Sequence, residues 1–176
     1  MPEYILKVLN ETALIFFVLG CHILDAKGRI NHLVISSDRV CIMRWQNYLD
    51  DQQSSFVEDL LDFVRIPSVS AANEHFDDVV RAGNWVVGRL QKAGIANARI
   101  METETHPTVY GDWMLAGSDK LTVLIYGHFD VQPAEPFDLW DSPPFEPIVV
   151  DGAVRGRGAS DDKGGMLIPI LAAEAL

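Results

Sequence analysis

The sequence predicts an α/β fold in which a central, mostly parallel sheet is flanked by helices. Residues 54–67 and 77–94 carry apolar side chains at helical spacing, so each predicts an amphipathic helix. Strand-like segments follow at residues 98–103, 108–115 and 121–127. The last of these is a continuous apolar run, which is typical of a strand covered on both faces. A helical pattern over residues 161–176 stops without a cap, so the fold is expected to be incomplete at the C-terminus.

Cap and turn residues predict where these elements begin and end. Ser55 and Glu58 have the spacing of a capping box, which predicts a helix start at Ser55. Gly94 is expected to stop the second helix, because glycine readily adopts the left-handed backbone of a helix terminus. The dipeptide Asp151-Gly152 predicts the turn of a β-hairpin.

The composition is that of a globular domain of ordinary size. Of the 176 residues, 48% are hydrophobic and 22% are charged. The net charge of −11 argues against nucleic acid as a partner, because phosphate binding needs a cationic surface. Cys21 and Cys41 are too few for a disulfide framework, so a reducing, cytoplasmic location is the simpler expectation.

The N-terminal segment is interpreted separately. Residues Thr12–Leu24 form an apolar run that is shorter than the ~20 residues needed to span a bilayer, so no membrane partner is expected. An export or lipoprotein signal is one reading, but two glutamates precede the run where such a signal carries positive charge. A buried strand or helix, or a stretch foreign to the domain, is favoured. We therefore divide the chain into an N-terminal extension of uncertain origin, residues 1–42, and a domain over residues 43–176.

The end of the apolar run 121–127 carries the first chemical signal. It leads into His128 and Asp130, whose side chains share a face if the strand continues. A metal-binding histidine usually donates its second ring N–H to a carboxylate, and open α/β sheets bind ligands beyond the carboxyl ends of their strands. The alternative is a surface histidine at a strand end, and this motif alone does not separate the two.

A second cluster lies in "GRGASDDKGG", residues 156–165. Ser160, Asp161 and Asp162 precede a helical pattern, so one explanation is that they cap the helix. Capping needs only one of them, however, and the flanking glycines permit a tight backbone path that brings a carboxylate close to a ligand. Oxygen ligands of this kind suit a divalent cation.

Taken together, "YGHFDVQP", "LWDSPPFEP" and "DGAVRGRGASDDKGG" closely resemble the M20 family of metallopeptidases, in particular its dipeptidase and carnosinase-like branch. The resemblance runs from about Leu49, through "FVRIPSVS" and "VYGDWML", to Leu176. It implies a zinc-exopeptidase-like catalytic domain, of which residues 43–176 would be the first part. The lid and dimerisation domain would lie outside this sequence.

The resemblance also implies roles for four residues. His128 is expected to bind one of two divalent metal ions, most often Zn²⁺, with Mn²⁺ or Co²⁺ as alternatives. Asp130 is expected to be the catalytic acidic partner that orients His128. Asp161 is expected to bridge the two metals, and Asp162 to hold the loop after an unusual cis peptide bond. The general base and the other ligands are expected downstream of Leu176.

The implied function is hydrolysis of dipeptides or short peptides by a water activated between two metals. N-acyl amino acids are an alternative substrate class, and a truncated, non-catalytic chain is a further alternative. The 176 residues alone are expected to be inactive, because two candidate ligands cannot complete two metal sites. The parent protein is expected to form a homodimer, as family members commonly do.

Other charged residues near these motifs are given simpler roles. Glu174 falls too early in the chain to be the general base of the family. Lys163 is expected to balance the charge of the two aspartates beside it. Arg155 and Arg157 are expected to be solvated charges of a hairpin, with contact to a substrate carboxylate as the alternative.

Overall fold

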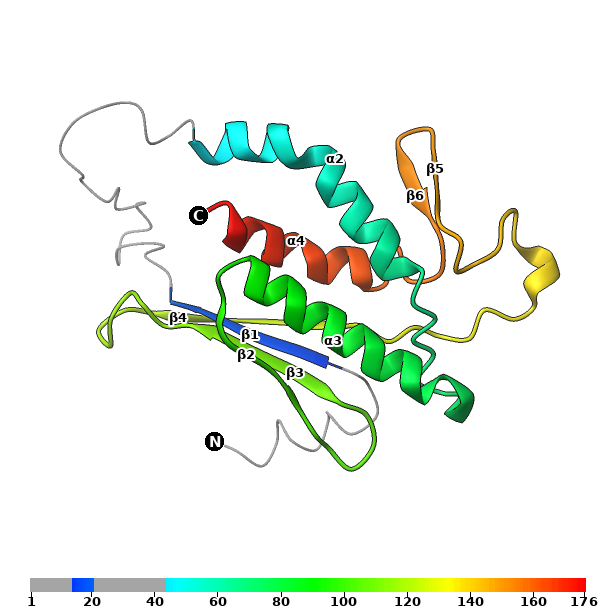
Figure 1. Ribbon diagram of the computed structural model, residues 1–176, viewed down its shortest axis with the longest axis horizontal. Helices are drawn as coiled ribbons and strands as arrows, with labels where there is room; N and C mark the ends of the chain where they lie inside the picture. Colours follow the sequence, from blue (N-terminus) through cyan, green and yellow to red (C-terminus); the bar gives the residue numbers. More distant parts are fainter. Residues whose placement is uncertain (1–13, 21–43) are drawn as a thin grey trace.

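Three α-helices lie on one side of a four-stranded sheet (Figure 1). The computed structural model describes residues 14–20 and 44–176 of the chain. The α-helices, in chain order, are α2 (Arg44–Val64), α3 (Phe76–Lys92) and α4 (Lys163–Glu174). Two 3-10 helices lie in connections, η1 (Asn73–His75) and η2 (Phe137–Leu139). The predicted α/β class is confirmed.

The sheet is mixed rather than mostly parallel. Its strands are β1 (Leu14–Gly20), β2 (Ala96–Met101), β3 (Thr108–Trp113) and β4 (Thr122–His128), in the order β2-β3-β1-β4. β1 is parallel to β3, whereas β1 with β4 and β2 with β3 are antiparallel pairs. The expectation of a mostly parallel sheet is therefore not confirmed.

The connections explain the mixed sheet. Parallel neighbours that follow one another need a crossover of about a dozen residues or more, usually a helix. The chain passes from β2 to β3 through residues 102–107, and from β3 to β4 through residues 114–121, with no helix in either connection. As a result β2 pairs antiparallel with β3, and β4 runs opposite to β3 with β1 between them.

β1 belongs to the segment that the sequence assigns to an N-terminal extension, residues 1–42. Its backbone pairs Ile15 with Val109 of β3 on one side and with Gly127 of β4 on the other. The apolar run Thr12–Leu24 thus contains a strand, which is one of the alternatives considered for it. The expectations for Cys21 and Cys41 lie outside the described residues, and the division at residue 43 stays a prediction.

The helix boundaries agree with the sequence in one case and not in the other. α2 begins at Arg44, so Ser55 and Glu58 lie inside it and the predicted capping box is wrong. The residues before Ser55 are mostly polar, and their helicity is not visible as an apolar stripe. α3 ends at Lys92, and Gly94 has a φ of 78°, as predicted for a helix stop. No helix in the described ranges is long and apolar enough to cross a membrane.

The predicted hairpin is confirmed. It consists of β5 (Ile148–Val150) and β6 (Ala153–Arg155), which pair antiparallel and form a separate two-stranded sheet (Figure 1). Asp151 has a φ of 52° and Gly152 a φ of 76°. Positive φ at both central residues is the signature of the two-residue turn that this dipeptide favours.

The core lies between the sheet and the helices. α3 contacts β2 and β3, α4 contacts β4, and α2 contacts α4. The fully buried apolar side chains of this core are Phe63, Val79, Ala82, Val86, Leu90, Val109, Phe129 and Ile170. Phe63 of α2 stacks on Trp85 of α3, with 4.2 Å between ring centroids. Because Phe129 directly follows β4, the core holds the carboxyl end of that strand in place.

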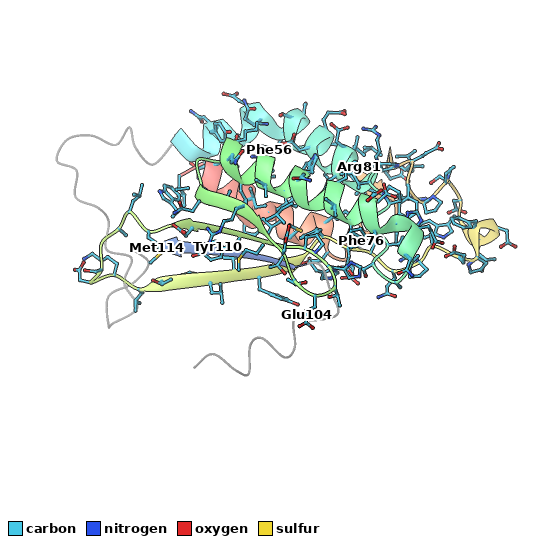
Figure 2. All side chains as sticks on the ribbon, turned by 60° about the horizontal axis from the view of Figure 1, so that its bottom comes forward. Phe56, Phe76, Arg81, Glu104, Tyr110 and Met114 are labelled. Atoms are coloured by element: carbon cyan, nitrogen blue, oxygen red, sulfur yellow. The ribbon has the colours of Figure 1, made fainter. Side chains whose placement is uncertain are left out.

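β4 itself is not covered on both faces, so that expectation is wrong. Val123 is 39% exposed and Leu124 is 54% exposed, although the strand reads as a continuous apolar run. The three α-helices described all lie on one side of the sheet (Figure 1). Met114, in the connection from β3 to β4, is 52% exposed and lies toward the left of the molecule in Figure 2.

Candidate metal centre

His128 is the last residue of β4 and is held by Asp130, two residues further along. Nδ1 of the ring lies 3.2 Å from Oδ1 of Asp130 and 3.2 Å from its main-chain oxygen. The side chain of Asp130 is buried. This adjacency is the one predicted from the alternation of side chains along a strand. Because Nδ1 faces Asp130, Nε2 is the nitrogen left to face other groups.

Nε2 of His128 faces the loop that precedes α4. It lies 3.0 Å from Oδ1 of Asp161, whose side chain is 86% exposed. The main-chain N–H of His128 donates to Oδ2 of Asp162 at 3.2 Å. The peptide bond between Asp161 and Asp162 is cis, as the family resemblance implied. The structure thus brings all four candidate residues, Asp130 included, to one place.

Glycines allow this loop to approach the strand end. A Cβ atom at Gly164 would lie 2.2 Å from the main-chain oxygen of Ala159. A Cβ atom at Gly165 would lie 2.2 Å from Oδ1 of Asp162. Both distances are far inside van der Waals contact, so neither position has room for a side chain. The glycines that flank the aspartates therefore serve the tight backbone path that the sequence suggested.

The surrounding carboxylates favour the protonated form of His128. The hydrogen bond to Asp130 raises the pKa of His128 to about 9. The charge of Asp130 and the hydrogen bond to Asp161 act in the same direction, whereas burial opposes them. The cluster therefore holds a proton at Nε2 near neutral pH. A metal ion bound there has to displace the proton.

The cluster opens into a pocket of about 160 Å³. The pocket is lined by His128, Asp130, Val131, Gln132, Arg157 and Asp161. Nη2 of Arg157 donates to the main-chain oxygen of Pro133 at 3.1 Å, and its guanidinium lies 5.0 Å from the ring centre of Trp140. Arg157 is therefore fixed at the pocket instead of being a solvated hairpin charge. A larger hollow of about 560 Å³, beside Arg65 and Phe145, is lined by none of the four candidate residues.

The donors present fit part of a metal site. An imidazole nitrogen and a carboxylate oxygen are both ligands of zinc, and those of His128 and Asp161 converge to 3.0 Å. Zinc sites take three or four protein ligands. Within residues 14–20 and 44–176, no group of three or more His, Cys, Asp or Glu side chains is arranged to hold a metal. The pair fits as two members of a larger ligand set.

Lys163 is a residue of this region whose role the sequence did not predict. It does not balance the neighbouring aspartates: its Nζ donates to the main-chain oxygens of Phe63 at 2.9 Å and Ile66 at 2.6 Å. The side chain is fully buried, and burial lowers the pKa of Lys163 to about 7. Lys163 thereby ties the start of α4, and the aspartate loop before it, to the end of α2. A lysine beside two aspartates carries no sequence signal for such an anchor.

Glu174 lies in a separate cluster and takes no part in this one. Its Oε1 accepts a hydrogen bond from the Tyr48 hydroxyl at 2.6 Å, and its Oε2 pairs with Arg89. Arg89 also binds Asp59 at 2.9 Å. The carboxylate of Glu174 therefore joins α2, α3 and α4. That it is not the general base stays a prediction.

A histidine held between two carboxylates at the carboxyl end of a strand in an α/β fold is an arrangement found in metal-binding sites. Residues 124–176 match the model of the family described as peptidase family M20/M25/M40. Over 140 residues the chain is 39% identical to the Cys-Gly metallodipeptidase dug1 of Schizosaccharomyces pombe, a match that covers 72% of this chain and 29% of that protein. The chain belongs to the M20 family of peptidases.

Solved structures share the fold. Human carnosine dipeptidase 1 superposes with a TM-score of 0.57 and 29% identity, over 76% of this chain and 30% of that chain. The dipeptidase Dug1p of Saccharomyces cerevisiae superposes with a TM-score of 0.59 over 77% of this chain and 31% of that chain. Its identity of 22% supports the fold alone. The chain spans less than a third of the length of these relatives.

Proposed function

We propose that the protein containing these residues is a metal-dependent dipeptidase that hydrolyses the peptide bond of dipeptides or short peptides. The observation that carries the proposal is the convergence of Nε2 of His128 and Oδ1 of Asp161 beside the buried Asp130. Relatives named Cys-Gly metallodipeptidase and carnosine dipeptidase support the same substrate class.

In this proposal His128 and Asp161 are metal ligands. His128, through Nε2, and Asp161, through its carboxylate, would help to hold two divalent ions, with Zn²⁺ as the first choice and Mn²⁺ or Co²⁺ as alternatives. Such ions, when bound, supply an activated water and polarise the scissile carbonyl. The general base and the other ligands are assigned to parts of the protein beyond residues 1–176, because the relatives are more than three times the matched length.

The chain's own side chains prepare the imidazole for this role. The main-chain oxygen of Asp130 accepts from Nδ1, and the carboxylate lies 3.2 Å from the same nitrogen, so the free electron pair of Nε2 is directed toward the pocket. Asp162 accepts from the main-chain N–H of His128 and keeps the aspartate loop against the strand end. The pocket of about 160 Å³ corresponds to roughly five water volumes. It accommodates a reacting amide, and the remainder of a substrate needs contacts elsewhere in the protein.

The test is hydrolysis of Cys-Gly by the full-length protein, with Zn²⁺, Mn²⁺ and Co²⁺ supplied in turn. We expect activity that a chelator abolishes and that His128→Ala lowers by at least about 100-fold. His75→Ala is the control, because His75 pairs with Asp78 outside the cluster. Absence of hydrolysis with all three ions would overturn the proposal. Faster release of amino acids from N-acyl amino acids would favour the deacylase alternative.

A second proposal concerns the 176-residue chain by itself, which we expect to be non-catalytic. It is favoured by the two converging donors of His128 and Asp161, which are fewer than a zinc site needs. Hydrolysis of Cys-Gly by purified residues 1–176, lost in His128→Ala, would overturn it.

We also propose a cytoplasmic location, no nucleic-acid or membrane partner, and a homodimer for the full-length protein. The net charge of −11 supports the absence of nucleic-acid binding. The mass of the full-length protein in solution tests the homodimer.

A further inference from the structure

Ser70 contacts Asp130 of the candidate metal site, and no sequence motif predicted this contact. Its hydroxyl donates to Oδ2 of Asp130 at 2.5 Å, across 60 residues of sequence. Asp130 turns its other oxygen, Oδ1, toward Nδ1 of His128 at 3.2 Å. Ser70, Asp130 and His128 therefore form a line of contacts that ends at the ring nitrogen facing Asp161.

The segment that carries Ser70 is fixed to the strand end by contacts other than its hydroxyl. The hydroxyl of Ser68, which is fully buried, donates to the main-chain oxygen of Phe129 at 2.6 Å. The main-chain N–H of Val131 donates to the oxygen of Ser68 at 2.9 Å, and Val69 forms a parallel bridge with Val131. These contacts hold the segment in place without the Ser70 hydroxyl, which donates its hydrogen bond to Asp130.

Asp130 needs this second partner because its side chain is buried. A carboxylate that is removed from water is stabilised by hydrogen bonds, and here Ser70 supplies the one to Oδ2. Oδ1 is buried without a hydrogen bond and has the 3.2 Å contact with Nδ1 of His128. Without the Ser70 hydroxyl, the carboxylate loses the hydrogen bond that opposes its rotation. A rotated carboxylate would then present a different oxygen, at a different distance, to Nδ1.

We propose that Ser70 is a positioning residue of the metal site, which acts on His128 through Asp130. This inference rests on the proposed function, because it assigns Ser70 to the same site. It predicts that loss of the hydroxyl weakens metal binding while leaving the fold intact. Groups that support a metal ligand from behind typically change metal affinity by about 10- to 100-fold when they are removed.

The experiment measures Zn²⁺ affinity by competition with a chromophoric chelator in the full-length protein and its variants. We expect Ser70→Ala to bind Zn²⁺ about 10- to 100-fold more weakly, and Ser70→Thr, which keeps a hydroxyl, to stay within about threefold of the unmodified protein. Ser118→Ala is the matched control. Ser118 is exposed in the connection from β3 to β4, outside the cluster, so loss of its hydroxyl is expected to leave the affinity unchanged.

Thermal unfolding of the metal-free proteins separates positioning from folding. Ser70→Ala is expected to unfold within a few degrees of the unmodified protein, because the contacts of Ser68 and Val131 remain. Equal Zn²⁺ affinities for Ser70→Ala and the unmodified protein would overturn the role of Ser70 while leaving the proposed function in place. An affinity lost equally in Ser70→Ala and Ser70→Thr would also overturn it. Failure of the unmodified protein to bind Zn²⁺, Mn²⁺ or Co²⁺ would overturn the proposed function, and this inference with it.

Discussion

Two clusters in this molecule each hold one basic side chain between two carboxylates, and they differ in how far solvent reaches these carboxylates. In the first, Arg89 lies between Asp59 and Glu174, and its own side chain is only 3% exposed. In the second, His128 lies between a buried carboxylate and that of Asp161, which is 86% exposed. We call the first cluster closed, because its carboxylates are only 22% and 13% exposed, and the second open, because it ends in a carboxylate that solvent reaches.

The closed cluster connects the three α-helices α2, α3 and α4. Asp59 comes from α2, Arg89 from α3 and Glu174 from α4. Tyr48 of α2 donates a further hydrogen bond to Glu174, and this bond raises the pKa of Tyr48 to about 12. Each carboxylate therefore has a fixed partner within the protein.

Charge pattern alone does not distinguish a structural ion cluster from a metal-binding one. Both have the same charge pattern, and both are formed by residues far apart in sequence. They differ in where the carboxylates point. His128 has one ring nitrogen committed to the buried Asp130, and the other faces a pocket and the exposed Asp161. An ion that enters the pocket meets both donors without unfolding anything.

Breaking the closed cluster is expected to have the largest effect on stability. Arg89→Met leaves Asp59 and Glu174 without their buried cation, which is expected to cost about 3 kcal/mol of unfolding free energy. Urea unfolding measures the loss. Arg65→Met is the matched control, since Arg65 pairs with Asp62 on the exposed surface and is expected to cost no more than about 0.5 kcal/mol. Equal losses would show that the cluster does not hold the helices together.

Removing the anchor behind the open cluster is expected to have the next largest effect. Lys163→Met leaves the main-chain oxygens of Phe63 and Ile66 without their donor, which is expected to cost about 2 kcal/mol near neutral pH. Lys92→Met is the control, because Lys92 is half-exposed and its ion pair with Asp59 is long, at 3.5 Å. An unfolding free energy unchanged in Lys163→Met would mean that water replaces the amine.

Much of the fold was predictable because it depends on local chemistry. Asp151-Gly152 needs positive φ at both residues, and that need identifies the hairpin from two letters of sequence. Gly94 marks the end of α3 for the same reason. The pairing of β1 with β3 and β4 was not predictable in this way. It depends on a strand from the segment 1–42, whose apolar run has several interpretations.

In the candidate site, too, contacts between residues close in sequence were predictable and those between distant residues were not. His128 and Asp130 are two residues apart, so strand geometry predicts their contact. Asp161 lies 33 residues from His128, and only the family resemblance connected the two. Ser70 and Lys163 were missed because a serine in a turn and a lysine beside aspartates have ordinary surface explanations. Their roles depend on burial and on the position of the partner, and neither can be predicted from the neighbouring residues.

The titration of His128 gives a smaller effect, with a sign that follows from its pKa. Folding raises the pKa of His128 from 6.5 to about 9, so the folded protein holds the proton more tightly. The resulting stabilisation is fully present below pH 6.5 and is lost as the pH rises through 9. We expect this contribution to be on the order of 1 kcal/mol, because solvent reaches the ring from the pocket side.

The measurement is the unfolding free energy of the metal-free protein from pH 6 to 10, with and without His128→Gln. The difference between the two curves isolates His128 from Lys163, whose lowered pKa acts with the opposite sign above pH 7. The difference is expected to shrink as the pH rises. A constant difference across this range would mean that Asp130 does not favour the protonated ring.

The smallest effect on stability is expected at the residue that makes the second cluster open. Asp161→Asn removes a charge that is 86% exposed, so the unfolding free energy is expected to change by no more than about 0.5 kcal/mol. Zn²⁺ affinity is expected to fall by at least about 10-fold, because a carboxylate ligand is lost. Asp141→Asn, at a side chain that is 94% exposed, is the control and should change neither quantity. If Asp161→Asn keeps its Zn²⁺ affinity, Asp161 does not bind the ion. The two clusters would then differ only in their exposure to solvent.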